Sequence, residues 1–317
     1  MPAIFHSNAR EPDNREPDNR EPDNREPDNR EPDNTTVINL DSQMLTSVPS
    51  AVRELSQLRS LSLYNNRLTT IPDWLWQLVE LQILNLSANQ LSTISPHIGT
   101  LTDLKMLDLG HNFLTQIPDS IGNLDKLQFL YLSNNQINAW PDAFANLSSL
   151  RYLNLTHNQF VNLPDSIGRL TALTELRLYN NQLTSLPHNV GRLDNLIELH
   201  LMQNRLQTLP NSIGRLQSLC LLDLQDNMLA VLPSAIGILS CLTHLNLRNN
   251  QIAALPESMG NLHRLRFLDL RNNKLTDLPE SMSYLPNLER LDLRWNLFTS
   301  SPVWLTELME RGCVVYL

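Results

Sequence analysis

Glycine, cysteine, long apolar runs and clustered positive charge are all scarce in this chain of 317 residues. It has nine glycines, and no apolar run approaches the roughly 18 residues of a membrane-spanning helix. The first 34 residues contain no apolar signal-peptide core. The three cysteines are an odd, scattered set instead of the paired sets of secreted domains. We therefore expect a soluble protein in a reducing compartment, most simply the cytoplasm, with no membrane association.

The negative charge is concentrated near the N-terminus. Five consecutive copies of Arg-Glu-Pro-Asp-Asn occupy residues 10–34, and each copy carries one positive and two negative charges. The unit has no apolar residue and its proline blocks helix formation, so it cannot bury surface to offset the entropy of ordering. We expect residues 1–34 to form a disordered tail. The remaining net charge is only −4 and no basic stripe occurs, which argues against nucleic acid as a partner.

A second period, of 23 residues, covers the rest of the chain. An apolar residue, nearly always leucine, recurs from Ile38 to Leu291 and again two residues later. Asparagine follows five residues after the first apolar position, except in the first repeat, which has Gln43. Proline follows eleven residues after it in every full repeat but one.

The same step carried past Leu291 places Val314 and Tyr316 at the two apolar positions of a closing repeat. We therefore expect a domain of residues 35–317 with twelve full repeats and one partial repeat. One unit cannot bury its leucines alone, but stacked units share one continuous core.

Each part of the repeat has a physical role. Leu-x-Leu alternation predicts a short strand with one buried face. Asparagine favours turns and bonds to backbone groups, so a column of asparagines can satisfy the peptide groups of adjacent coils. The Leu-Pro that follows prevents return to the sheet. Ile-Gly-x-Leu, as at residues 121–124, then returns the chain through a helical or 3-10 turn.

The complete unit resembles the leucine-rich repeat in its 23-residue Leu-Pro/Ile-Gly form. It is similar to the repeats of Ras-associated and Scribble-type intracellular scaffolds, and to those of bacterial proteins delivered into host cells. The resemblance implies an α/β solenoid, a horseshoe with a parallel sheet on its concave face and short helical or 3-10 turns on its convex side. It does not identify a partner, because a fold does not specify a function.

The ends of a stack need covering. Trp74 and Trp304 lie two residues after a proline near opposite ends, and we interpret them as shields of the terminal coils. The alternative is a partner contact on the outer side. Residues 303–311 predict a short helix and residues 313–317 a closing strand, while Trp140 is expected in the core.

The residues that flank the Leu-x-Leu positions face solvent on the sheet. Four successive strands present Ile83, Met106, Phe129 and Tyr152 in one column, with Tyr131 beside Phe129. The core is already filled by leucine, so this apolar column predicts a binding hot spot. Cross-strand stacking that stabilises the sheet is the alternative, and the two are compatible.

A polar column occupies the C-terminal third. Arg248, Arg271 and Arg294 follow the second leucine of three successive repeats. The adjacent column contains Asn246, Asp269 and Asp292. We expect an internally paired ladder of exposed ion pairs, and as an alternative a surface that recognises an acidic partner.

No catalytic or ligand-binding motif occurs in the sequence. There is no phosphate loop, no Gly-x-Ser-x-Gly, no paired-cysteine zinc spacing and no His-Glu-x-x-His. His200, Asp223 and His244 lie on successive predicted strands, but we interpret them as polar side chains of a hydrated sheet, and Cys220 as an incidental small residue. We expect no enzymatic activity, no metal and no cofactor.

The sequence thus predicts a protein–protein interaction module that is a monomer on its own. A cytoplasmic scaffold or regulator would bind a protein partner on the concave face. The alternative is a bacterial effector, located in the host cytosol, that binds a host protein or another effector.

Overall fold

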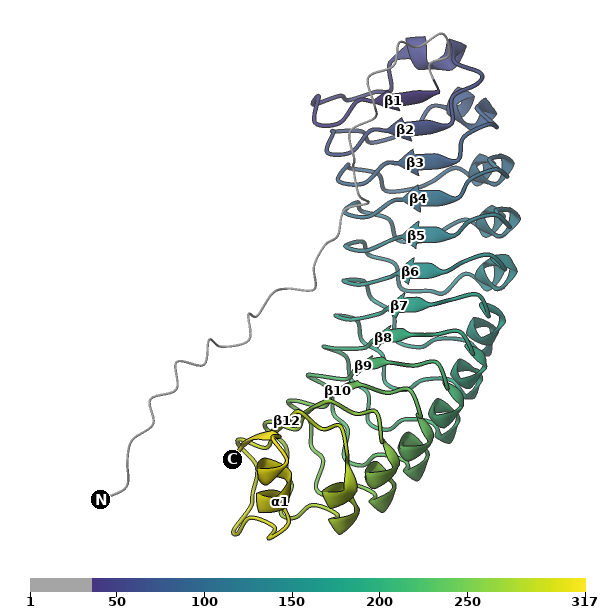
Figure 1. Ribbon diagram of the computed structural model, residues 1–317. Helices are drawn as coiled ribbons and strands as arrows, with labels where there is room; N and C mark the ends of the chain where they lie inside the picture. The colour runs from purple at the N-terminus through teal and green to yellow at the C-terminus, as the bar shows by residue number, and fades with distance from the viewer. Residues whose placement is uncertain (1–35) are drawn as a thin grey trace. The chain divides into compact units, whose positions relative to one another are not determined.

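The computed structural model describes residues 36–317, which form a curved array of repeats (Figure 1). The predicted disordered tail lies outside the described residues. Within them, thirteen strands form one open parallel sheet in chain order. The fold is therefore the predicted leucine-rich-repeat horseshoe, with the sheet lining its inner side and 3-10 turns on its outer side.

Every strand has three residues. The strands are β1 (Val37–Asn39), β2 (Ser60–Ser62), β3 (Ile83–Asn85), β4 (Met106–Asp108), β5 (Phe129–Tyr131), β6 (Tyr152–Asn154), β7 (Glu175–Arg177), β8 (Glu198–His200), β9 (Leu221–Asp223), β10 (His244–Asn246), β11 (Phe267–Asp269), β12 (Arg290–Asp292) and β13 (Val314–Tyr316). The central leucines are buried from β2 to β12, and residues 23 apart are paired across neighbouring strands from β1 to β12.

The outer side carries a 3-10 helix in all but the last coil. These helices are η1 (Ser50–Glu54), η2 (Asp73–Gln77), η3 (Pro96–Thr100), η4 (Asp119–Asn123), η5 (Asp142–Asn146), η6 (Asp165–Arg169), η7 (His188–Arg192), η8 (Asn211–Arg215), η9 (Ser234–Ile238), η10 (Glu257–Asn261) and η11 (Glu280–Tyr284). Proline stands immediately before each helix except η3, which begins with Pro96. The fixed φ of proline suits this start, where its missing N–H is not needed.

The asparagine of each repeat joins two adjacent coils. Asn181 is buried, and its Nδ2 donates to the carbonyl oxygens of Leu155 and Leu178, each at 3.0 Å. Its Oδ1 accepts from the backbone N–H of Phe160 at 3.0 Å. The same bonds recur from Asn66 to Asn296, so the predicted asparagine column is confirmed.

The sharp bend lies one residue before the asparagine. From Asn65 to Trp295, the residue at this position has φ between +52° and +59°. That conformation is costly for most residues but tolerated by asparagine, which fills the position at Asn65, Asn134, Asn180, Asn249 and Asn272. The tolerance of asparagine for positive φ therefore matters at the residue just before the buried asparagine of each repeat.

The closing coil departs from the 23-residue step. Leu291 pairs with Val315, and Arg290 pairs with Val314, so the expectation that Val314 continues the leucine series is wrong by one residue. The α-helix α1 (Leu305–Glu310) replaces the 3-10 helix in this coil. The helix accommodates the one residue by which this repeat exceeds the 23-residue step. As a result, Val315 packs against the core while Val314 is exposed.

The tryptophans lie as the terminal-shield interpretation requires. Trp74 and Trp304 are partly buried and pack against the hydrophobic core near its two ends, and Trp140 packs against the core in mid-array. Within residues 36–317, no helix is both long enough and apolar enough to cross a bilayer.

The asparagine column predicts a stability effect that depends on position. Asn181→Ala should lower the free energy of unfolding by about 1–3 kcal/mol, because buried backbone groups of two coils lose their partners. Asn138, whose side chain is exposed, is the matched control, and Asn138→Ala should change it by less than about 0.5 kcal/mol. Urea denaturation followed by circular dichroism measures both; equal losses in the two variants would contradict the ladder's role.

Candidate partner-binding surface

Two side chains of every strand face the inner side of the curve, because they alternate with the buried central residue. The residues before that central position form the first column, and the residues after it form the second column. A third column lies two residues further along the chain. Since neighbouring strands pair in register, each column presents one residue per strand to the same surface.

The first column is apolar over four strands. Ile83 pairs with Met106, Met106 with Phe129, and Phe129 with Tyr152. In the second column, Tyr131 lies against Tyr152 with ring centroids 4.8 Å apart. We call these five residues the apolar patch. Ile83 and Phe129 are 39% and 38% exposed, and the other three are partly exposed.

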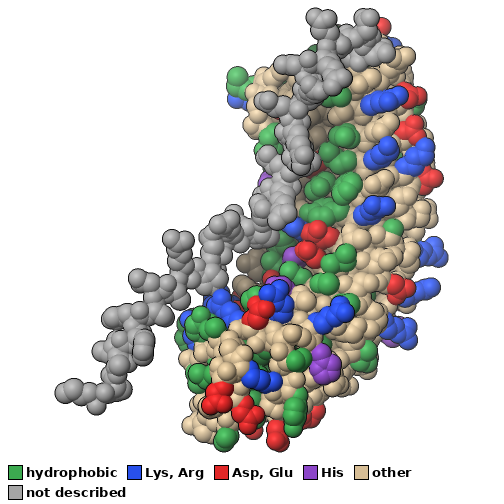
Figure 2. All heavy atoms as spheres, viewed as in Figure 1, with side chains coloured by type: hydrophobic (Ala, Val, Ile, Leu, Met, Phe, Trp, Pro, Cys, Tyr) green, Lys and Arg blue, Asp and Glu red, His purple; other side chains and the backbone are tan. Residues whose placement is uncertain are grey.

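Figure 2 shows hydrophobic side chains gathered on the inner face over the upper strands, with charged side chains below them. The sequence prediction that these five residues come together is therefore met by the structure. Their role in binding stays a prediction.

Charged residues border the patch at β7. The guanidinium of Arg177 lies over the ring of Tyr152, 5.6 Å from its centroid. Its Nε also donates to Oε1 of Glu175 at 2.5 Å. Burial raises the pKa of the Tyr152 hydroxyl, so the ring presents a neutral phenol at physiological pH. Arg177 thereby connects the aromatic end of the patch to the acidic side chains beside it.

The structure groups His200 with two glutamates. Its Nε2 lies 3.0 Å from Oε2 of Glu198 and 4.0 Å from Oε1 of Glu175. The candidate ligand atoms of these three residues all lie within 4.8 Å of one another, a spacing that a metal ion can bridge. Glu175 already accepts a hydrogen bond from Arg177, and a bound cation would compete with that guanidinium.

The trio considered from sequence, His200, Asp223 and His244, does not form. The ring of His244 stacks on Phe267 with centroids 4.6 Å apart. Asp223 accepts from the backbone N–H of Gln225, and burial raises the pKa of its carboxyl. The sequence spacing correctly placed these residues on neighbouring strands, but side-chain direction decided which of them meet.

Sequence reasoning missed Asp108, which lies in the second column beside the apolar patch. Its Oδ1 accepts from the backbone N–H of Gly110 at 2.8 Å. Burial raises the pKa of its carboxyl to about 6, against the opposing effect of hydrogen bonds from Gly110 and Ser87. The sign of this site in the sequence was an aspartate at the second-column position between Asn85 and Tyr131.

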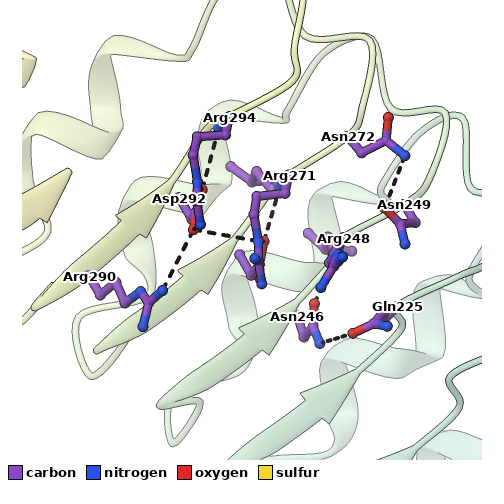
Figure 3. A network of polar contacts seen from close by, with 12 residues as sticks. Gln225, Asn246, Arg248, Asn249, Arg271, Asn272, Arg290, Asp292 and Arg294 are labelled. Atoms are coloured by element: carbon purple, nitrogen blue, oxygen red, sulfur yellow. Dashed lines mark hydrogen bonds and ion pairs between the residues drawn. The ribbon is translucent and has the colours of Figure 1, made fainter. Parts of the chain in front are cut away.

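The arginine column is only partly the exposed ladder that was expected. Arg271 donates to both oxygens of Asp269. Arg294 donates to both oxygens of Asp292 (Figure 3). Asp292 is only 1% exposed, so the expectation of exposed pairs is wrong for this residue. Among residues 36–317, Arg248 has no carboxylate partner, so the expected pairing of all three arginines is also wrong.

Comparison with known families agrees with this geometry. A family model described as a leucine-rich repeat matches residues 33–91, 80–137 and 240–298. A second, described as a leucine-rich repeat region, matches residues 142–226. A comparison with curated protein sequences finds no significant match.

Solved structures with the same architecture come from several kinds of organism. One is the ectodomain of the receptor kinase GASSHO1/SCHENGEN3 from Arabidopsis thaliana in complex with CASPARIAN STRIP INTEGRITY FACTOR 2, at 33% identity and a TM-score of 0.67. The match covers 82% of this chain and 36% of that ectodomain. This chain therefore spans only about a third of the length of that ectodomain.

Two further structures match over most of their length. One is a chain of the octameric complex of Latrophilin 3, Unc5D and FLRT2, in which FLRT2 is the leucine-rich-repeat component. It is 26% identical to this chain with a TM-score of 0.71, and the match covers 86% of each of the two chains. An internalin of Listeria monocytogenes is 24% identical with a TM-score of 0.69, covering 89% of this chain and 86% of that one, and shares the fold alone.

The buried carboxyl predicts a pH-dependent stability. Because the pKa of Asp108 is raised in the folded state, its charge destabilises the fold above pH 6. That penalty is relieved as the pH falls from about 6 toward 4. Asp108→Asn keeps an acceptor for Gly110, so at pH 7.5 it should raise the free energy of unfolding by up to about 3 kcal/mol.

The gain should shrink at pH 4.5, as measured by urea denaturation at both pH values. Asp119→Asn, at an exposed carboxylate, is the control and should change stability little at either pH. An Asp108→Asn variant that is less stable than the wild type at pH 7.5 would show that the carboxylate is favourably bound there.

Proposed function

Since the chain belongs to the leucine-rich-repeat family, we propose that it is a protein-binding module whose partner docks on the inner face over the apolar patch. One observation carries the proposal. Four consecutive strands present an apolar first-column residue, although the core beneath them is already filled by leucine. These side chains are not needed for burial of the core, so their exposure is a cost that a docked partner would remove.

The composition of the patch favours recognition over simple packing. Aromatic residues and methionine are enriched at the energetic centres of interfaces, and methionine adapts to irregular surfaces. Tyr131 and Tyr152 are held by mutual contact and by Arg177, so a partner would meet them already ordered. Ordering before binding reduces the entropy that docking must overcome.

The sheet is longer than a small partner can cover. Twelve strand spacings of about 4.8 Å give an inner face nearly 60 Å long. Polar positions select a docking point poorly, because they lose hydration on contact and regain little. The apolar patch therefore provides the anchor, and the arginine column orients an acidic edge of the same partner.

Structures of relatives support this type of function. The plant receptor ectodomain is in complex with CASPARIAN STRIP INTEGRITY FACTOR 2, and the leucine-rich-repeat component FLRT2 is in complex with Latrophilin 3 and Unc5D. From these relatives we infer that this chain also binds a protein or peptide and does not catalyse a reaction.

We further propose a scaffold of the Ras-associated or Scribble type, monomeric on its own and located in the cytoplasm. The 23-residue Leu-Pro/Ile-Gly repeat supports the type. Three cysteines present as free thiols, of which Cys220 and Cys241 are partly exposed, support a reducing location. Residues 35–317 would be the binding domain.

Selection from a random 12-residue peptide library, displayed with no free C-terminus, tests the docking surface. Peptides enriched on the full chain should bind the double variant Phe129→Ala/Tyr152→Ala at least tenfold more weakly, because both anchors are lost. Its melting temperature should fall by no more than about 3 °C, since cross-strand contacts contribute little.

Phe113→Ala is the matched control, because Phe113 is 52% exposed and lies outside the three inner columns. It should leave peptide affinity unchanged. Enriched peptides that lose affinity with Phe113→Ala but not with the double variant would place binding elsewhere on the molecule.

A further inference from the structure

Arg248 differs from the other arginines of the third column in its charge environment. Arg271 pairs with Asp269 at 2.5 Å, and Arg294 pairs with Asp292 at 2.8 Å. Among residues 36–317, no carboxylate lies within ion-pair distance of Arg248. Its Nε is buried and donates to no described group. A buried donor without an acceptor is costly, so the structure leaves this guanidinium incompletely satisfied. The residue as a whole is only partly buried, so its positive charge is open to an acceptor that a partner brings.

The cause is a single residue of the second column. β11 and β12 carry Asp269 and Asp292, whereas β10 carries Asn246 at the equivalent position. Asn246 Oδ1 accepts from the backbone N–H of Arg248 at 3.1 Å, as Asp269 Oδ1 does from that of Arg271 at 3.0 Å. The backbone geometry is therefore the same in both repeats, and only the negative charge is missing (Figure 3).

Asparagine also separates neighbouring carboxylates. Asp223 precedes Asn246 in the column, and Asp269 follows it. An aspartate at position 246 would make four successive carboxylates, with mutual repulsion on a partly buried surface. Asn246 instead donates to Oε1 of Gln225 at 3.2 Å. The local structure is thus satisfied with asparagine, and one guanidinium remains uncompensated.

We propose that Arg248 is the receptor for an acidic side chain, an aspartate or glutamate carboxylate, of the protein partner. This inference rests on the proposed function. Arg271 and Arg294 already hold carboxylates, so a partner's acid would have to compete with Asp269 or Asp292 there. Arg248 forms a charge-assisted, bidentate pair without such competition.

The geometry also sets the spacing of the partner's groups. Tyr152 on β6 and Arg248 beyond β10 are four strand steps apart, which is about 19 Å across the strands at about 4.8 Å per step. Arg248 also lies four residues further along its repeat than Tyr152, an offset of up to about 13 Å along the strand direction, so the two are about 19–23 Å apart. In an extended segment, about six or seven residues span that distance, so the partner presents an apolar or aromatic anchor and an acidic residue about six or seven positions apart.

Peptides from the display library, resynthesised with blocked ends, test this directly against the full chain. Sequences enriched on the wild type should contain Asp or Glu, and changing that residue to Gln should weaken binding at least tenfold. Asn246→Asp, which neutralises Arg248, and Arg248→Gln should each weaken binding of the acidic peptide at least tenfold. Neither variant should weaken binding of the Gln peptide further. Arg205→Gln, at an exposed arginine outside the inner columns, controls for net charge and should have little effect.

The outcomes separate the two proposals. Peptides that depend on Phe129 and Tyr152 but bind Asn246→Asp and Arg248→Gln normally would overturn the role of Arg248 and leave the docking surface intact. Failure to obtain any patch-dependent peptide would instead contradict the proposed function. A further peptide carries phosphoserine in place of the Asp or Glu. If it binds more than tenfold more tightly than the acidic peptide, a phosphate and not a carboxylate is the preferred ligand of Arg248, which would overturn the proposal. Circular dichroism melting verifies that each variant is folded.

Discussion

The structure depends on the way each coil satisfies the buried peptide groups of the coil before it. A short strand, a tight bend and a proline-terminated segment leave many N–H and C=O groups without partners in their own repeat. The asparagine amide connects these groups across the 23-residue step, with two bonds to its own coil and two to the preceding coil, as at Asn181. A change in repeat length would misalign these bonds, so the step stays constant wherever the asparagine ladder continues.

A constant step has a consequence for function. Residues of equal position in successive repeats lie side by side, and the inner columns become continuous surfaces whose chemistry the fold does not dictate. The leucines, asparagines and prolines are needed for folding, whereas Phe129, Tyr152 and Arg248 are not required by the core or the ladder. The first column is apolar over β3 to β6 and mixed from β7 onward, where charged residues such as Glu175 and Arg290 share it with Leu221 and Phe267. We propose that this variation determines partner specificity.

The sequence predicted the sheet, its register and the inner columns because period and burial determine them. The closing coil was placed one residue out of register, since the period alone does not show that α1 replaces a 3-10 helix there. Side-chain contacts were harder to predict. His200 meets Glu175 and Glu198, while His244 stacks on Phe267, because rotamer direction selects among several neighbours at strand spacing. The missing partner of Arg248 was visible in sequence as Asn246, but its meaning required the paired geometry of Arg271.

Photo-crosslinking from the inner face tests the central claim, that a partner docks over the apolar patch, most directly. Benzoylphenylalanine replaces Phe129 in one variant and the exposed Phe113 in another, and each is irradiated with a patch-selected peptide. We expect the peptide to crosslink efficiently from position 129 and at background level from position 113. Crosslinking from position 113 with none from position 129 would contradict it, and would leave the apolar patch as packing within the sheet.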